Sequence, residues 1–350
     1  MTKRIPITTL IATGLALQVF GLAPSVMSQC NADEMKAAPI ALKVHTWVPL
    51  GGQFKLGLSA QASKSSKSDD IAISVNGVGS DGTRWGIESK DGGKTWGELA
   101  GHGGKLSSAP ACDRDNAYQG TRCFWVSDGG FLWSQLGDGE FVGGISGMKA
   151  TADPGVFDNG FGDMYVFAHN ADDNALWFAA TKDGKLAGKW TSLGGELQGQ
   201  PSCLKTGEHH VGPAFGGSNL PDFSCFVLGS DGVVWAGHEA QAPSQFGNPA
   251  ITTTQYVWES IGGEALGGVD AFRTAYASGT GNVMLAVRGT DSALWIAHQE
   301  STGDGFGSTS EWKWKRYPGE IASVPSCALT YCFAVLPDGQ LGFLDLTGRL

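Results

Sequence analysis

Tryptophan and histidine stand three residues apart at two matching points of this 350-residue chain. The two copies are Trp235 with His238 and Trp295 with His298. An indole ring stacks on the C–H face of a sugar, and a nearby imidazole or carboxylate binds the sugar hydroxyls. A concave site with an aromatic wall and a few polar groups is typical of small-ligand sites. The spacing therefore indicates a carbohydrate-binding pocket at each place.

Related residues occupy the same position elsewhere in the chain. Trp85 is followed three residues later by Glu88, whereas Trp133 and Trp177 are followed by apolar residues. We expect a ring of similar pockets; the alternative is that these tryptophans only pack neighbouring strands together. The candidate ligand-binding residues are Trp85, Glu88, Trp133, Trp177, Trp235, His238, Trp295 and His298.

These residues belong to a phrase that the sequence repeats six times. It runs from Asp-Gly or Asp-x through Leu-Trp to Trp-x-x-Leu-Gly-Gly-x-Leu and Ser-x-Pro. A period near 50 residues built of short strands is typical of a β-propeller, because one four-stranded unit cannot bury its own faces. The aspartates that mark the phrase are Asp81, Asp128, Asp173, Asp231, Asp291 and Asp338.

Each repeat divides into four antiparallel strands, with an Asp-Gly pair suited to the tight turn before the third. The segment 47–52 has the sequence pattern of a fourth strand, but no hairpin precedes it. The last hairpin, at 332–346, has no fourth strand after it. An N-terminal strand that completes the C-terminal blade removes two exposed sheet edges. The sequence therefore predicts an all-β propeller of six blades closed in this way, with seven blades as the alternative.

Six of the seven cysteines form pairs within single repeats. Only four residues separate Cys327 from Cys332, so those strands must form a hairpin, and a bridge requires adjacent strands. Disulfides of this kind indicate an oxidising compartment. A metal site is the alternative, but the pairs lie in different repeats. The predicted disulfides are Cys112–Cys123, Cys203–Cys225 and Cys327–Cys332, with Cys30 unpaired.

The N-terminus has the pattern of a secretory signal peptide. Lys3 and Arg4 precede an uncharged, largely apolar stretch at 5–22, and small or polar residues follow up to Ser28. A transmembrane anchor is the alternative for this stretch, and no later segment is long enough to span a membrane. We expect a signal peptide at 1–28, a short leader at 29–41 and one propeller domain at 42–350. The protein is expected to be secreted, to the periplasm or the extracellular space.

Composition and motifs exclude several function classes. The net charge of −10 and the lack of a basic stripe argue against nucleic-acid binding. The chain has no Gly-x-Ser-x-Gly, no His-Glu-x-x-His and no phosphate-binding glycine loop, so we expect neither a cofactor nor an enzyme. The expected partner is a carbohydrate or glycoconjugate, and the oligomeric state stays open.

One motif supports an enzymatic alternative. Residues 89–96 match the Asp-box turn Ser-x-Asp-x-Gly-x-Thr-Trp, which occurs in sialidases and in many non-catalytic propellers. A sialidase-like glycoside hydrolase would need three arginines gathered on a carboxylate, and the eight arginines here are scattered. A protein-interaction propeller that uses its long loops is a second alternative.

The repeat resembles that of the bacterial PLL-type β-propeller lectins and, more distantly, the tectonin and tachylectin propellers. This resemblance covers residues 45–350 and implies pockets between blades for fucose or related sugars. That role would fall on Trp295 with His298 and on Trp235 with His238. The chain differs from PLL-type lectins in having six repeats rather than seven and in its cysteine pairs. The stretches that carry the resemblance are 190–201, 258–263 and 287–298.

Overall fold

Strands and turns make up the described part of the chain, which contains no helix and thus no helix able to cross a membrane. The computed structural model describes residues 46–64, 70–115, 120–145, 147–160, 163–210, 219–240, 255–274, 283–302 and 309–350. Within these ranges the all-β prediction is confirmed. The predicted signal peptide at 1–28, the leader at 29–41 and Cys30 lie outside the described residues.

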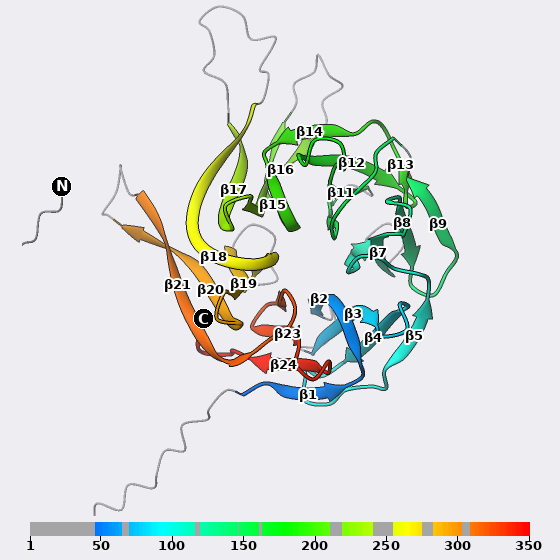
Figure 1. Cartoon of the computed structure of the whole chain (residues 1–350), viewed down its shortest axis with the longest axis vertical. Helices are drawn as coiled ribbons and strands as arrows, with labels where there is room; N and C mark the ends of the chain where they lie inside the picture. Colours follow the sequence, from blue (N-terminus) through cyan, green and yellow to red (C-terminus); the bar gives the residue numbers. More distant parts are fainter. Residues whose placement is uncertain are drawn as a thin grey trace, which may run out of the picture. The chain divides into compact units, whose positions relative to one another are not determined.

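The strands form four-stranded antiparallel units that follow one another along the chain and surround a common axis (Figure 1). The seven-stranded sheet contains two such units, because β18 pairs with β17 through 255–264 and with β19 through 265–273. The first unit consists of β2 (Phe54–Lys64), β3 (Ile71–Gly79), β4 (Arg84–Ser89) and β5 (Ala100–Gly103), and the second of β6 (Ala111–Asp115), β7 (Gly120–Val126), β8 (Leu132–Leu136) and β9 (Phe141–Ile145). The third consists of β10 (Gly155–Asp158), β11 (Met164–His169), β12 (Leu176–Lys182) and β14 (Thr191–Gly194), with the short β13 (Lys185–Leu186), and the fourth of β15 (Leu197–His210), β16 (Asn219–Gly229), β17 (Val233–Ala240) and the first half of β18 (Gln255–Arg273). The fifth consists of the rest of β18 with β19 (Val283–Gly289), β20 (Ala293–Thr302) and β21 (Thr309–Glu320), and the sixth of β22 (Ser326–Ala328), β23 (Tyr331–Val335), β24 (Leu341–Asp345) and β1 (Val48–Gly51).

The first strand of the described chain belongs to the same sheet as the last three. Val48 of β1 lies opposite Phe343 of β24, in the antiparallel pairing predicted from the phrase at 47–52. Trp47 packs against the hydrophobic cluster between the fifth and sixth units. Strand β1 thereby covers an edge of β24 that would otherwise present unpaired backbone groups.

A hydrophobic cluster lies between each unit and the next, and another joins the sixth unit to the first. Alternating side chains of each strand point to opposite neighbours, so both faces of a unit are covered. The cluster between the first and second units is the smallest of these. Its buried members are Val78, Leu106, Cys112, Cys123 and Trp125.

The three predicted disulfides are confirmed, and each joins the first and second strands of one unit. The paired cysteines face each other directly in the strand register, with Cα–Cα distances of 4.0 to 4.1 Å. The bridges are Cys112–Cys123 in the second unit, Cys203–Cys225 in the fourth and Cys327–Cys332 in the sixth.

The Asp-box motif forms a self-contained turn after β4. The amides of Gly93 and Thr95 donate to Ser89 Oγ and Asp91 Oδ1 at 2.8 and 2.9 Å. Hydrogen bonds from the hydroxyl and amide of Thr95 lower the pKa of Asp91 to about 2. The Trp96 ring meets Phe343 edge-on. Every side chain of the motif that is named here serves the turn or the packing beneath it.

Candidate functional site

Four of the five third-strand tryptophans in the described chain donate to a carboxylate four residues earlier in the chain. In the fifth unit, Trp295 Nε1–H donates to Asp291 Oδ1 at 3.0 Å, and the amide of Ala293 donates to the same oxygen at 3.1 Å. This spacing lets one aspartate cap the tight turn and also orient the ring. The same indole–carboxylate contact, at 3.1 to 3.4 Å, occurs at Asp81–Trp85, Asp173–Trp177 and Asp231–Trp235.

Three of the predicted tryptophans pack against neighbouring units and line neither of the two hollows described next. In the second unit the aspartate stands five residues before the tryptophan, and Asp128 accepts from the Ser107 hydroxyl instead. Trp133 borders the small cluster between the first and second units. Trp85 and Trp177 likewise border the clusters on the sides of the preceding units.

A hollow lined by two tryptophans lies between the third and fourth units, and we call it the first indole hollow. Its volume is about 240 Å³. Trp235 of β17 and Trp258 of β18 form its aromatic walls, and both rings are half-buried. The lining residues are Gly195, Glu196, Leu197, Gly229, Ser230, Asp231, Trp235 and Trp258.

The second indole hollow repeats this arrangement between the fourth and fifth units. Its volume is about 390 Å³, and Trp295 of β20 and Trp314 of β21 form the walls. The equivalent residues of the two hollows come from the same points of the repeat. The lining residues are Gly263, Glu264, Val287, Gly289, Thr290, Asp291, Trp295 and Trp314.

Glycines allow the rings to lie directly on the backbone in both hollows. A Cβ atom at Gly229 or Gly289 would lie 2.6 Å from the indole of the following third strand. A Cβ atom at Gly263 would lie 2.5 Å from Trp314 of the next unit, and Gly263 also has a φ of +81°. Trp258 Nε1–H donates to the Leu193 carbonyl of the preceding unit at 3.0 Å. These contacts fix the walls before any ligand binds.

Each hollow places carboxylates beside its aromatic walls. Asp231 Oδ1 accepts from the amide of Val233 at 3.0 Å, while its Oδ2 has no hydrogen-bond partner among the described residues. Asp291 Oδ2 accepts from Arg316 Nε at 2.6 Å. Hydrogen bonds from Arg316 and then Trp295 lower the pKa of Asp291 to about 2. A half-exposed indole next to an ionised carboxylate is suited to stacking on a sugar ring and accepting its hydroxyl hydrogens.

The predicted pairing of each tryptophan with the residue three positions later does not occur within one hollow. Residues three apart in a regular strand point to opposite faces. Trp295 borders the cluster shared with the fourth unit, whereas His298 falls on the face of Leu294 and Ile296, toward the sixth unit. His298 is absent from the lining of the second hollow.

The same parity separates the two other predicted pairs. Trp235 borders the cluster shared with the third unit, and His238 lies on the opposite face of β17. Trp85 faces the sixth unit, and Glu88 lines a polar cavity on the side of the second unit. Histidine is therefore not the polar partner of these tryptophans in the hollows.

The polar groups that do line the hollows were missed in the sequence. The sequence predicts Asp231 and Asp291 only as residues of tight turns, and it predicts no role for Glu196 and Glu264. Trp258 and Trp314 are not among the predicted ligand-binding residues. The sequence signal for the two glutamates is the recurrence of Gly-Gly-Glu at 194–196 and 262–264. In both places this motif ends where the chain crosses from one unit to the next.

A cavity of about 610 Å³ with polar walls lies between the first and second units. The buried guanidinium of Arg84 donates to Asn76 Oδ1 and Gln135 Oε1 at 3.1 and 2.9 Å. Burial lowers the pKa of Arg84 to about 10, and the nearby charge of Asp138 opposes that shift. His102 Nδ1 lies 2.5 Å from Asp138 Oδ1. These polar groups lie where the other interfaces between units have apolar residues. The lining of this cavity contains no pair of tryptophans.

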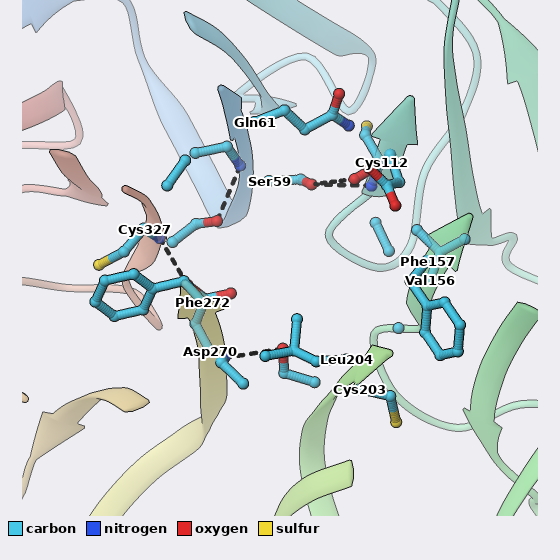
Figure 2. Close-up of a pocket in the computed structure, with 18 of the residues that line it drawn as sticks. Ser59, Gln61, Cys112, Val156, Phe157, Cys203, Leu204, Asp270, Phe272 and Cys327 are labelled. Atoms are coloured by element: carbon cyan, nitrogen blue, oxygen red, sulfur yellow. Dashed lines mark hydrogen bonds between the residues drawn. The ribbon is translucent and has the colours of Figure 1, made fainter. Parts of the chain in front are cut away.

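The innermost strands of all units line an axial cavity of about 420 Å³ (Figure 2). Hydrogen bonds of its polar side chains join five of the six neighbouring pairs of inner strands. Figure 2 shows Ser59 facing Cys112, whose amide donates to Ser59 Oγ at 2.9 Å. The other ties run from the amides of Asp158, Ala271, Cys327 and Ala60 to Asp113, Ser202, Asp270 and Ser326. The polar lining of this cavity therefore serves the packing of the inner strands.

One aspartate of the axial cavity, Asp270, makes the stability of the fold depend on pH. Burial raises the pKa of Asp270 from 3.8 to about 8. Between pH 6.5 and 8 the folded protein keeps a proton that the unfolded chain has released, so stability is present at low pH and lost as pH rises through 8. Burial raises the pKa of Asp113 and Asp153 only to about 6 and lowers that of His169 to about 4, outside this window.

We expect the free energy of unfolding to fall by about 1–2 kcal/mol between pH 6.5 and pH 8. Urea denaturation at several pH values measures it. Asp270→Asn keeps an oxygen that accepts from the Cys327 amide and removes the titrating group, so its stability should stay flat over this range. An equal decline in the Asp270→Asn variant would show that another group carries the dependence.

Comparison with known proteins identifies the fold and no sequence family. No protein-family model matches this sequence, and no curated protein has a matching sequence. A mutant of Aleuria aurantia lectin, solved with α-methyl-L-fucoside, is similar over 85% of this chain and 95% of that chain, with 12% identity and a TM-score of 0.53. The SapL1 lectin, solved with α-methyl fucoside, is similar over 81% and 89%, with 14% identity and a TM-score of 0.50.

A sialidase also has a similar fold. The NanB sialidase of Streptococcus pneumoniae is similar over 90% of this chain and 69% of its own, with 9% identity and a TM-score of 0.50. At these identities the likeness shows the fold alone. The fold is the β-propeller that these lectins and this sialidase share.

Proposed function

We propose that this protein is a secreted, lectin-like β-propeller that binds saccharides in its two indole hollows. The observation that carries the proposal is the repetition of one arrangement between different units. In each hollow, two half-buried tryptophans stand beside an aspartate and a glutamate. Two equivalent sites on one rigid chain would gain avidity on a glycan surface.

The architecture that we infer is a six-bladed propeller closed by β1. The division of the seven-stranded sheet at β18 supports the count of six. The pairing of β1 with β24 and the cluster between the sixth and first units support the closure. Closure of this kind removes exposed strand edges, which would otherwise pair with other chains.

Export from the cytoplasm is part of the proposal. Three disulfides within single units favour an oxidising compartment, because the cytosol keeps most thiols reduced. The basic start at Lys3 and Arg4 and the apolar stretch that follows supply the export signal.

The sugar-binding residues that we propose are Trp235 with Trp258 and Trp295 with Trp314, with the neighbouring carboxylates as hydroxyl acceptors. Two lectins of similar fold were solved with methyl fucosides, so fucose belongs among the sugars to be tested. The arginine positions favour this reading over a sialidase. None of the four cavities described above is lined by more than one arginine.

A glycan array with the mature chain, followed by calorimetry of the hits, tests the proposal. We expect saccharide binding without release of sugar from chromogenic glycosides. His238→Ala and His298→Ala are expected to bind as the wild type does, because these histidines lie on the opposite faces of their strands. Turnover of a glycoside would favour the hydrolase instead, and loss of binding in both histidine variants would place the sites elsewhere.

A further inference from the structure

Both indole hollows carry negative charge and no lining cation. Glu196 and Asp231 line the first hollow, and Glu264 and Asp291 line the second. No lysine or arginine lines either one. All four carboxylate residues are exposed, so they stand at the mouths of the hollows rather than in the packed interfaces.

The two glutamates carry no internal partner. Neither Glu196 nor Glu264 has a side-chain hydrogen bond or ion pair within the described chain. Each follows two glycines at the point where the chain crosses to the next unit, at 194–196 and 262–264. Their carboxylates are therefore available to a ligand, and nothing in the fold requires their charge.

The tryptophan walls favour the same kind of ligand as the carboxylates. The face of an indole ring attracts a cation through its quadrupole, and the attraction grows when the cation is partly desolvated. An ammonium group that enters a hollow would lie among two indole rings and two carboxylate side chains. An acidic sugar would instead place like charges together, which opposes binding.

We propose that the indole hollows select saccharides that carry a protonated amine, that is, amino sugars with a free amino group. The proposal rests on the proposed function and adds a charge preference to it. Neutral sugars such as fucose stack on the same rings but leave the carboxylates without a cation. The negative charge of uronic and sialic acids opposes their binding.

The two hollows differ in whether the aspartate has a cationic partner. Asp291 Oδ2 in the second hollow accepts from Arg316 Nε at 2.6 Å, whereas Asp231 Oδ2 in the first hollow has no partner among the described residues. The first hollow thus has the larger uncompensated negative charge. Its preference for an amine should be the stronger, and Arg316→Gln should strengthen the preference of the second hollow.

The experiment is a calorimetric titration of the full mature chain with glucosamine, glucose, glucuronic acid and choline. At pH 6 we expect glucosamine to bind about fivefold or more tightly than glucose, from contacts of the ammonium group with rings and carboxylates. Glucuronic acid should bind least. At pH 9, where the amine of glucosamine is neutral, its advantage over glucose should disappear.

Variants assign the effect to the hollows. Glu196→Gln and Glu264→Gln together should lower the affinity for glucosamine by a larger factor than the affinity for glucose, because glutamine keeps an oxygen that accepts from a hydroxyl group but removes the negative charge. Glu320→Gln is the matched control, because Glu320 stands at the same point of the fifth unit's Gly-Glu phrase but lines neither hollow. It should behave as the wild type.

The outcomes separate this inference from the proposed function. Equal binding of glucosamine and glucose at pH 6 would overturn the charge preference and leave the lectin intact. Binding of choline as tight as that of glucosamine, with no binding of glucose, would show that the hollows recognise ammonium groups rather than sugars. Absence of binding by every sugar tested would overturn both.

Discussion

Replacing Trp235 by alanine is expected to remove saccharide binding at the first indole hollow and to lower the free energy of unfolding by about 3 kcal/mol. The substitution deletes one of the two walls of the hollow and leaves a gap beside the cluster between the third and fourth units. Trp-to-Ala changes in cores cost about 3–5 kcal/mol, and the half-exposed ring of Trp235 favours the lower end. Calorimetry should show one binding site in place of two.

Trp177→Ala is the matched control for this variant. Trp177 is also half-buried and also donates to an aspartate four residues earlier, but it lines neither hollow. It should lose a similar amount of stability and keep both binding sites. If Trp177→Ala and Trp235→Ala lost binding to the same degree, binding would follow overall stability and the assignment of the hollow would be wrong.

Removal of the Cys203–Cys225 bridge should have the second largest effect. Cross-linking residues 22 positions apart restricts the unfolded chain, and the loop-entropy model assigns about 3 kcal/mol to a loop of this size. The double variant Cys203→Ala/Cys225→Ala should therefore have a free energy of unfolding lower by about 3 kcal/mol. Urea denaturation measures this difference as a lower midpoint concentration. Both cysteines are buried in the cluster between the third and fourth units, so the lost sulfur contacts act in the same direction.

The Cys327–Cys332 bridge supplies the internal comparison, because it spans only 5 positions. The same model assigns it about 2 kcal/mol. If Cys327→Ala/Cys332→Ala proved the more damaging pair, restriction of the unfolded chain would not explain how these bridges stabilise the fold.

The fold was predictable because the same residue types recur at the same positions of each repeat. The cysteines of the second, fourth and sixth units lie in register because their positions in the repeat match. The pairing of β1 with β24 followed from one unpaired phrase at each end of the chain. Such local and repeated signals do not depend on which side chains meet across an interface.

The site was only half predictable, because it joins two units. Trp235 and Trp295 were identified from their recurrence, but strand parity turns His238 and His298 to the opposite faces. The residues that line one hollow come from different units and meet only after the units pack. Glu196 and Trp235 are one such pair. Sequence spacing within one strand carries no information on that meeting.

A crystal structure of the protein with a saccharide that it binds tests the central claim most directly. The proposed lectin function requires the sugar to lie against Trp235 and Trp258 in one hollow and against Trp295 and Trp314 in the other, within reach of Asp231 and Asp291. A sugar found instead in the axial cavity, or beside Arg84 in the polar cavity between the first and second units, would contradict it.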